Sequence, residues 1–285
     1  MKILPINPTT HVNGHEWIPS SFSAFIQELE HFVSSEKKQN NSILFRGHSN
    51  YQWLLDSTFI RNVKKNILNV DPLSKIRHDY RYSKEYNRLI ASLFLYKFSI
   101  VTQPSQDLKK LAKKGIDPFF EWMKRIQQYP NEDVTPLLRG TFLIDWSKNE
   151  KVAMFFASEY DEFHNDGVLW IVNLTATGKV LHRDLTLEKI LTKYKKAFIA
   201  DKPFGLPLVF FPRYQLECEQ ANNQEVVYMA QMDMRLDLFE LWEKYEIENN
   251  KQVIIKLRLP HKIKKECRNW LESNGITKKF LFPKI

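Results

Sequence analysis

The segment GVLWIVNL, residues 167–174, constrains the fold of this 285-residue chain more than any other part of the sequence. It is an almost unbroken apolar run of strand length. A strand with one solvated face alternates apolar and polar residues, whereas a continuous apolar run predicts a strand buried on both faces. The chain must therefore cover both sides of a central sheet.

The rest of the chain supplies strands and helices in irregular order. Apolar spacing predicts helices over 20–38, 82–101, 105–115, 117–129, 149–160, 185–196, 235–249 and 261–275, and strands over 42–45, 140–147, 205–215, 222–231 and 252–260. Because β-α-β units do not alternate regularly, we expect an α+β fold with a mixed, mainly antiparallel central sheet and peripheral helices. We interpret residues 1–285 as a single domain, with 61–130 as a helical insertion or subdomain.

Composition and short motifs exclude several classes of protein for this chain. With 43% hydrophobic and 26% charged residues, the chain can build a core and stay in solution. It shows no leader and no apolar run near the length of a membrane span, so we expect a cytoplasmic protein without a membrane partner. Cys218 and Cys267 are isolated and the histidines have no metal-like spacing, which predicts neither disulfides nor a metal. P-loop and Rossmann glycine motifs are absent.

The formal net charge of +9 is concentrated near the end of the sequence. Residues 251–285 hold ten Lys or Arg and two Glu. Such a region favours nucleic acid or an acidic protein as partner, and neutralising Lys262, Lys264 and Lys265 would test this. The alternative is a solvated basic face.

Three short segments carry the polar residues that could do chemistry. In the first, Phe45-Arg46-Gly47-His48, the predicted strand ends at an arginine whose planar fork suits phosphate or carboxylate. The following glycine allows close approach of a ligand or a turn. The alternative is a structural turn, in which the arginine caps carbonyls or pairs with a carboxylate.

The second segment is LIDWSKNEKVAMFFA, residues 143–157. Ser147 and Glu150 have the spacing of a capping box, which by itself explains a helix start. Asp145 lies between Ile144 and Trp146 and needs a partner if it is buried. An internal ion pair between Arg46 and Asp145 is one interpretation of both residues, and a ligand site at the strand end is the other.

The third segment is NNQEVVYMAQ, residues 222–231, where Glu225 and Gln231 could reach a site from a late strand. A glutamate there could orient a ribose hydroxyl, and a glutamine offers neutral hydrogen bonds. The alternative is a solvated strand face.

Together these segments resemble the FRG domain, a bacterial and phage family named for its Phe/Tyr-Arg-Gly motif. The matching residues are Phe45-Arg46-Gly47 with Trp53, Leu55 and Arg61, then Leu143 to Ser147 with Ala153 to Ala157, and more loosely Arg213, Ala230-Gln231 and the ending NGITKKFLFPKI. The chain departs from the family where a histidine usually precedes the second block. It keeps Thr141, but it has Phe142 in place of an arginine and Ser147 in place of a threonine.

The order of these motifs is similar to that of ADP-ribosyltransferase-like folds, and the resemblance implies a sheet of that type and NAD as the substrate. Arg46, Asp145, Ser147 and Gln231 would then act in catalysis. Phe45, Arg46, Gly47, Trp146 and Glu225 would bind NAD. The implied function is that of a toxin or phage-defence effector, with an antitoxin as a further partner. The alternative is a binding module for nucleotides or nucleic acid without turnover.

Overall fold

The computed structural model describes residues 4, 10–12, 15–68, 123, 125–128, 133, 137–159, 164–176, 208–210, 218–231 and 237–283. The strands are β1 Thr10–Val12, β2 Glu16–Ile18, β3 Ile43–His48, β4 Leu143–Ser147, β5 Gly167–Asn173, β6 Leu208–Phe210, β7 Val226–Ala230 and β8 Ile254–Leu259. The helices are α1 Phe22–Lys38, α2 Thr58–Val63, α7 Glu150–Ala157, α9 Glu219–Asn223, α10 Leu238–Asn249, α11 Lys264–Ser273 and α12 Lys278–Leu281. A π-helical turn, Lys64–Leu68, follows α2, and a 3-10 turn, His261–Ile263, precedes α11.

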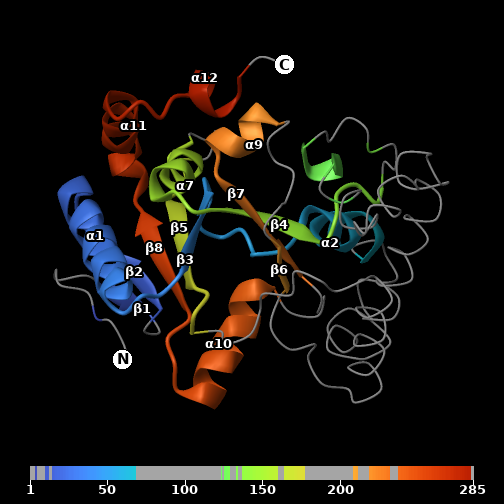
Figure 1. Ribbon diagram of the computed structural model, residues 1–285, viewed down its shortest axis with the longest axis horizontal. Helices are drawn as coiled ribbons and strands as arrows, with labels where there is room; N and C mark the ends of the chain where they lie inside the picture. Colours follow the sequence, from blue (N-terminus) through green and yellow to red (C-terminus); the bar gives the residue numbers. More distant parts are fainter. Residues whose placement is uncertain are drawn as a thin grey trace.

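The described strands form one eight-stranded sheet in the order β1-β2-β8-β5-β3-β4-β7-β6. Neighbouring strands are antiparallel except β2 and β8, which are parallel. The expected α+β class with a mainly antiparallel sheet and peripheral helices is therefore confirmed (Figure 1). None of the described helices is long and apolar enough to cross a bilayer.

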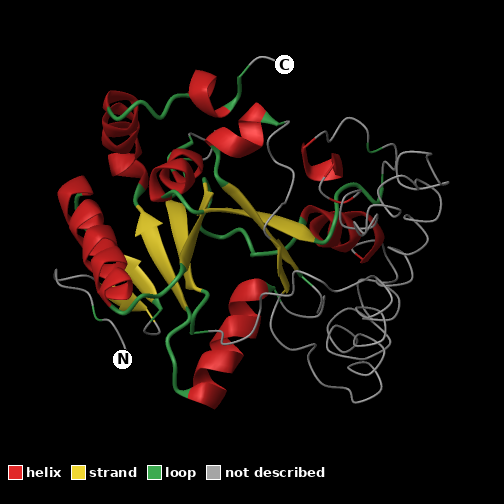
Figure 2. Cartoon of the chain, viewed as in Figure 1, coloured by secondary structure: helices red, strands yellow, loops and turns green. Residues whose placement is uncertain are grey.

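The central strand β5 is buried at every position, as its apolar run predicts. It pairs with β3 on one side and β8 on the other. Helices α1, α7 and α11 pack their apolar side chains on one face of this sheet, and α10 packs on the other. Figure 2 shows the strands between these helices.

Helix α1 illustrates how local sequence specifies an element. Ser21 is its N-cap, and the hydroxyl accepts a hydrogen bond of 3.1 Å from the backbone nitrogen of Ala24. Phe25, Leu29 and Phe32 recur at helical spacing and are buried against the sheet. The prediction of a helix over 20–38 is confirmed.

Two wrongly predicted boundaries affect the candidate site residues. The strand over 42–45 does not end at Arg46, because β3 continues through His48 in register with β5, where His48 pairs with Val168. Residues 222–225 do not belong to a strand, since α9 runs to Asn223 and Glu225 has a left-handed φ of 45°. Most of the expected helical insertion, and the helices expected over 82–101, 105–115 and 185–196, lie outside the described residues.

Candidate functional site

Strands β3 and β4 separate close to the Phe-Arg-Gly motif. Their ladder has one pair, Phe45 with Ser147, whereas β3 pairs with β5 at six positions. Beyond this pair the two strands diverge, as Figure 1 shows. A cavity of about 160 Å³ lies where they separate. It is lined by Phe45, Arg46, Gly47, Asp145, Trp146, Ser147, Val152, Ala153, Phe156, Gln224 and Val226.

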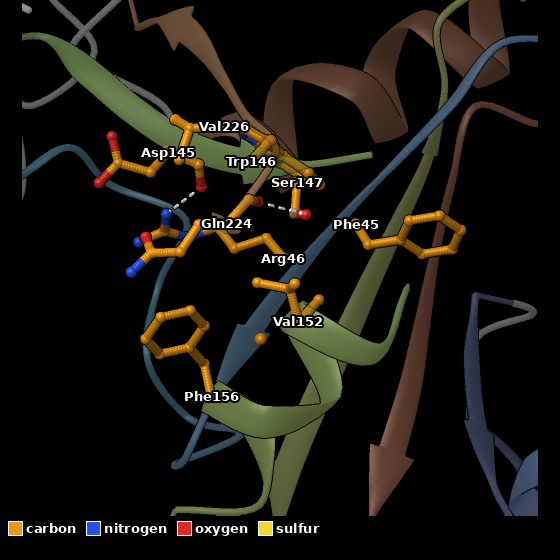
Figure 3. Close-up of a pocket in the computed structure, with 11 residues that line it drawn as sticks. Phe45, Arg46, Asp145, Trp146, Ser147, Val152, Phe156, Gln224 and Val226 are labelled. Atoms are coloured by element: carbon orange, nitrogen blue, oxygen red, sulfur yellow. Dashed lines mark hydrogen bonds between the residues drawn. The ribbon is translucent and has the colours of Figure 1, made fainter. Parts of the chain in front are cut away.

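The polar centre of this cavity is the guanidinium of Arg46 (Figure 3). Its Nε donates to Nε2 of His48 at 2.9 Å, and its Nη1 donates to the backbone carbonyl of Asp145. In the described part of the chain, Nη2 makes no hydrogen bond. Burial lowers the pKa of Arg46 to about 10, which still leaves it charged at neutral pH.

The carboxylate of Asp145 does not pair with Arg46. Its Oδ1 accepts a hydrogen bond of 3.0 Å from Nε2 of Gln127. Figure 3 shows the carboxylate turned away from the guanidinium, which the Asp145 carbonyl contacts instead. Burial raises the pKa of Asp145, while the nearby charge of Arg46 opposes this rise. The interpretation of an Arg46–Asp145 ion pair is therefore wrong for the described residues.

Gly47 has a packing role in this structure. A Cβ atom at Gly47 would stand 1.8 Å from the carbonyl oxygen of Ala153, and one at Gly167 would stand 2.0 Å from that of Ala157. These two glycines lie on neighbouring strands beneath α7, and the two alanines are one helical turn apart. Gly47 therefore allows the backbone of β3 to approach helix α7 closely.

Ser147 does not cap α7, so the predicted capping box with Glu150 is wrong. Ser147 is the last residue of β4, and its hydroxyl donates to the carbonyl of Gln224 at 2.8 Å. The N-cap is Asn149, whose Oδ1 accepts from the backbone nitrogen of Lys151 at 3.0 Å. The spacing was compatible with a cap, but pairing with Phe45 and with β7 keeps Ser147 in the sheet.

The two aromatic residues predicted to bind NAD are largely core residues. Trp146 is 2% exposed and packs edge-on against Trp242 at 5.7 Å. Phe45 is 1% exposed and belongs to the core beneath α1 and α7. Both residues line the cavity, but they are so deeply buried that little of either ring is accessible to a ligand.

Residues 41–166 match the model of the FRG domain. The chain contains an FRG domain. The match begins just before β3 and ends just before β5, so it includes Arg46 and Asp145. The looser parts of the resemblance, Ala230-Gln231 and the ending after Gly275, lie outside it. No curated protein and no solved structure matches the chain.

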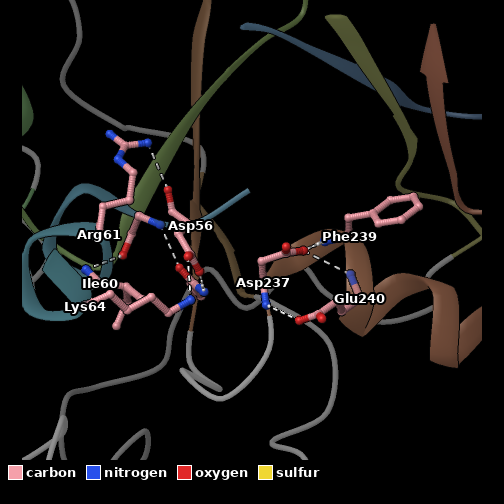
Figure 4. Close-up of polar contacts among 9 residues, drawn as sticks. Asp56, Ile60, Arg61, Lys64, Asp237, Phe239 and Glu240 are labelled. Carbon is pink, nitrogen blue, oxygen red and sulfur yellow. Dashed lines mark hydrogen bonds and ion pairs between the residues drawn. The ribbon is translucent and has the colours of Figure 1, made fainter. Parts of the chain in front are cut away.

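Gln231 lies outside the FRG domain and does not line the cavity. It is 1% exposed; its Oε1 accepts from the backbone nitrogen of Ser57 at 2.7 Å, and its Nε2 donates to Oδ1 of Asp56 at 2.8 Å. The other oxygen of Asp56 pairs with Nζ of Lys64 at 2.5 Å (Figure 4). Gln231 thus joins the end of β7 to the start of α2.

Glu225 lies at the edge of the cavity. It is exposed, and its chain neighbours Gln224 and Val226 both line the cavity. Its Oε1 accepts from Nδ2 of Asn149 at 2.9 Å. Of the two late-strand candidates, Glu225 is therefore the one near the FRG motif.

Three residues that support this site were not predicted as functional. His48 contacts Arg46, and Gln127 holds the carboxylate of Asp145. Thr141 donates from its hydroxyl to Oε1 of Gln127 at 3.2 Å and so orients that amide. Thr141 and His48 lie within or next to the family motifs, and that position could have indicated a role in the site. Nothing in the sequence around Gln127 indicates its role.

Proposed function

We propose that this FRG domain protein binds NAD at the cavity between β3 and β4 and acts as an ADP-ribosyltransferase-like toxin or phage-defence effector. One observation carries the proposal. The guanidinium of Arg46 faces the cavity with Nη2 unpaired and without an ion pair to a carboxylate in the described structure. A charged guanidinium in that state favours an anionic ligand, and its planar donors suit phosphate oxygens.

The size of the cavity indicates which part of NAD it would take. Sites for drug-sized ligands measure roughly 300–1,000 Å³, so a cavity of about 160 Å³ accommodates one compact group, such as a phosphate or a ribose. The remainder of the dinucleotide would lie outside it. This arrangement fits a ligand held by its phosphate and extended over the surface of the loop that follows β3.

Trp53 on that loop offers a ring for the base. Its side chain is 51% exposed, and its ring centroid lies 6.0 Å from that of His48, which contacts Arg46. Aromatic rings bind nucleobases by stacking on an accessible face. We therefore assign base stacking to Trp53, whereas Trp146, which the resemblance placed in NAD binding, is buried in the core.

The proposed reaction breaks the bond between nicotinamide and the ribose C1′ atom. Nicotinamide leaves with the bonding electrons, positive charge develops on the ribose, and a nucleophile of the acceptor adds at C1′ and loses its proton. Among the described residues, Asp145 lines the cavity and Glu225 lies at its edge, and we assign to these two carboxylates the stabilisation of this charge.

Labelled NAD tests the proposal. Purified protein should release nicotinamide or transfer label to an acceptor. Arg46→Lys should lower the rate at least tenfold, because an ammonium group lacks the planar set of donors that contacts His48, the Asp145 carbonyl and the ligand. Arg139→Lys, at an exposed arginine, is the matched control and should leave the rate unchanged. Folded protein that neither binds nor consumes NAD would refute the proposal.

A second candidate function is nucleotide binding without turnover. The position of Gln231 favours it, because this late-strand residue is committed to Asp56 and Ser57 rather than to the cavity. Calorimetry separates the two functions: ADP-ribose binding without any consumption of NAD supports the binding module.

The acceptor or partner is proposed to be nucleic acid or an acidic protein, with an antitoxin as a further partner. Lys262, Lys265, Lys278 and Lys279 are exposed near the end of the chain. Lys264 is fully buried, so the expectation that it belongs to a basic surface is wrong. Binding that weakens steeply with salt, and is lost on replacing Lys262 and Lys265 by alanine, would support a nucleic acid partner.

A further inference from the structure

His48 forms a side-chain pair with Arg46, which lines the cavity. They are two residues apart on β3, so their side chains project from the same face of the strand. Nε of Arg46 lies 2.9 Å from Nε2 of His48. A guanidinium only donates hydrogen bonds, so Nε2 must be the acceptor and carry no proton. His48 is therefore neutral, with its proton on Nδ1.

The surroundings of His48 leave its ring little freedom. The residue is 4% exposed, and its ring lies between the edge of Trp170 at 6.4 Å and the ring of Trp53 at 6.0 Å. A hydrogen bond to the backbone of Trp53 favours the protonated ring and so opposes the lowering of the His48 pKa. The indole Nε1 of Trp170 lies 3.4 Å from Nδ1 of His48, at the outer limit of hydrogen-bond distance. A neutral ring accepts at one nitrogen only, and the shorter bond of 2.9 Å from the charged Arg46 makes Nε2 that acceptor.

The charged groups near this pair are mainly cationic. Burial, followed by the charges of Arg46 of β3 and Arg61 of α2, holds the pKa of His48 well below its usual range. From β8, Nζ of Lys256 lies 5.4 Å from the ring centroid of Trp170. Among the described carboxylates, Asp145 of β4 acts on both arginines, and Gln127 donates a hydrogen bond to it.

We propose that His48 is a positioning residue for Arg46 whose protonation closes the anion site. By accepting the Nε proton, neutral His48 fixes the guanidinium so that Nη1 contacts β4 and Nη2 faces the cavity. A protonated ring has no acceptor at Nε2 and places a like charge beside the guanidinium. The orientation of Arg46 is then lost, and nucleotide affinity falls in acid. The ligand named in this inference rests on the proposed function, but the role of His48 does not.

Nuclear magnetic resonance of ¹⁵N-histidine-labelled protein tests the pair without any ligand. The His48 signals are assigned by comparison with His48→Gln. The expected result is a neutral ring with its proton on Nδ1, which persists at pH values where exposed histidines are protonated. A proton on Nε2, or titration near the ordinary histidine pKa of about 6.5, would overturn the proposal.

Binding of ADP-ribose is measured from pH 4 to pH 8 to test the consequence, because the lowered pKa of His48 places its protonation in more acidic solution than that of exposed histidines. Glutamine keeps a neutral acceptor, so His48→Gln should bind within about threefold of the wild type at pH 7.5 and lose none of its affinity in acid. His48→Leu should bind about tenfold more weakly at every pH, since the Nε contact is gone.

Two outcomes of the binding experiment would overturn the inference. One is an acid loss in His48→Gln that equals that of the wild type, and the other is a folded His48→Leu protein with wild-type affinity. If the wild type binds no nucleotide at any pH, the proposed function fails, and the resonance experiment still decides the role of His48.

Discussion

Gly47 lies so close to α7 that a Cβ atom there would stand 1.8 Å from the carbonyl oxygen of Ala153. The glycine of the Phe-Arg-Gly motif is thus the point at which the strand bearing Arg46 meets the helix that walls the cavity. Arg46 precedes Gly47 in the chain, Val152 precedes Ala153, and both Arg46 and Val152 line the cavity. The contact between Gly47 and Ala153 therefore also sets the position of the cavity walls.

We expect Gly47→Ala to destabilise the protein strongly. The added methyl group cannot fit without moving α7, and overpacking of this kind costs about 1–3 kcal/mol or more. Urea unfolding measures the change. Gly275→Ala is the control, because its Cβ would meet nothing within 4 Å and only its φ of 78° opposes the substitution, at about 1 kcal/mol. Equal stability of Gly47→Ala and the wild type would contradict the contact.

Lys264→Met should unfold more easily than Lys265→Met. Lys264 is fully buried, and its Nζ donates to the carbonyls of Ser49 at 2.7 Å and Glu159 at 2.9 Å. Losing these bonds leaves buried carbonyls unsatisfied and costs about 2–3 kcal/mol. The neighbouring Lys265 is exposed, so its substitution should change the unfolding free energy by less than about 0.5 kcal/mol. Similar effects of the two substitutions would be evidence against the buried role of Lys264.

Asp237 should make the protein less stable as the pH rises from about 4 to 6. It caps α10 by accepting from the backbone nitrogens of Phe239 at 2.7 Å and Glu240 at 3.0 Å (Figure 4). Burial, followed by the nearby charge of Asp56, raises its pKa to about 6. The native state therefore binds a proton that the unfolded state releases above its pKa of about 3.9, and the unfolding free energy falls through this window by roughly 3 kcal/mol.

Asp237→Asn isolates that effect. Asparagine keeps an acceptor for the cap but cannot ionise, so the variant should lack the fall between pH 4 and 6 that the wild type shows. Asp237→Ala also loses the cap and should be about 1 kcal/mol less stable than Asp237→Asn at every pH. Thermal or urea unfolding across the pH range measures both, and parallel profiles for wild type and Asp237→Asn would refute the expectation.

Trp53→Ala should weaken binding of ADP-ribose about tenfold without affecting the fold, because base stacking contributes about 1–3 kcal/mol and the side chain is 51% exposed. Leu54→Ala, at a neighbour that is 47% exposed, should leave affinity unchanged. Ribose 5-phosphate, which lacks a base, should bind wild type and Trp53→Ala equally. An equal loss for both ligands would show that Trp53 acts by another route.

The sequence by itself determined the elements whose local signals agree with their surroundings. The apolar run of β5 required burial on both faces, and Ser21 with Phe25, Leu29 and Phe32 specified α1. The paired motifs around Arg46 and Asp145 indicated the FRG domain from the sequence alone, and the family model matches the same segment. These features could be predicted because each depends on residues close together in the chain or on a short motif.

Only the tertiary structure decided what the polar residues do. Ser147 had the spacing of a cap, yet its pairing with Phe45 across 102 positions of sequence keeps it in the sheet. Gln231 and Asp56 meet, as do Arg46 and the carbonyl of Asp145, because strands distant in sequence are neighbours in one sheet. The physical reason is that a hydrogen bond depends on distance and direction in space, and sequence spacing fixes these only within a single helix, strand or turn.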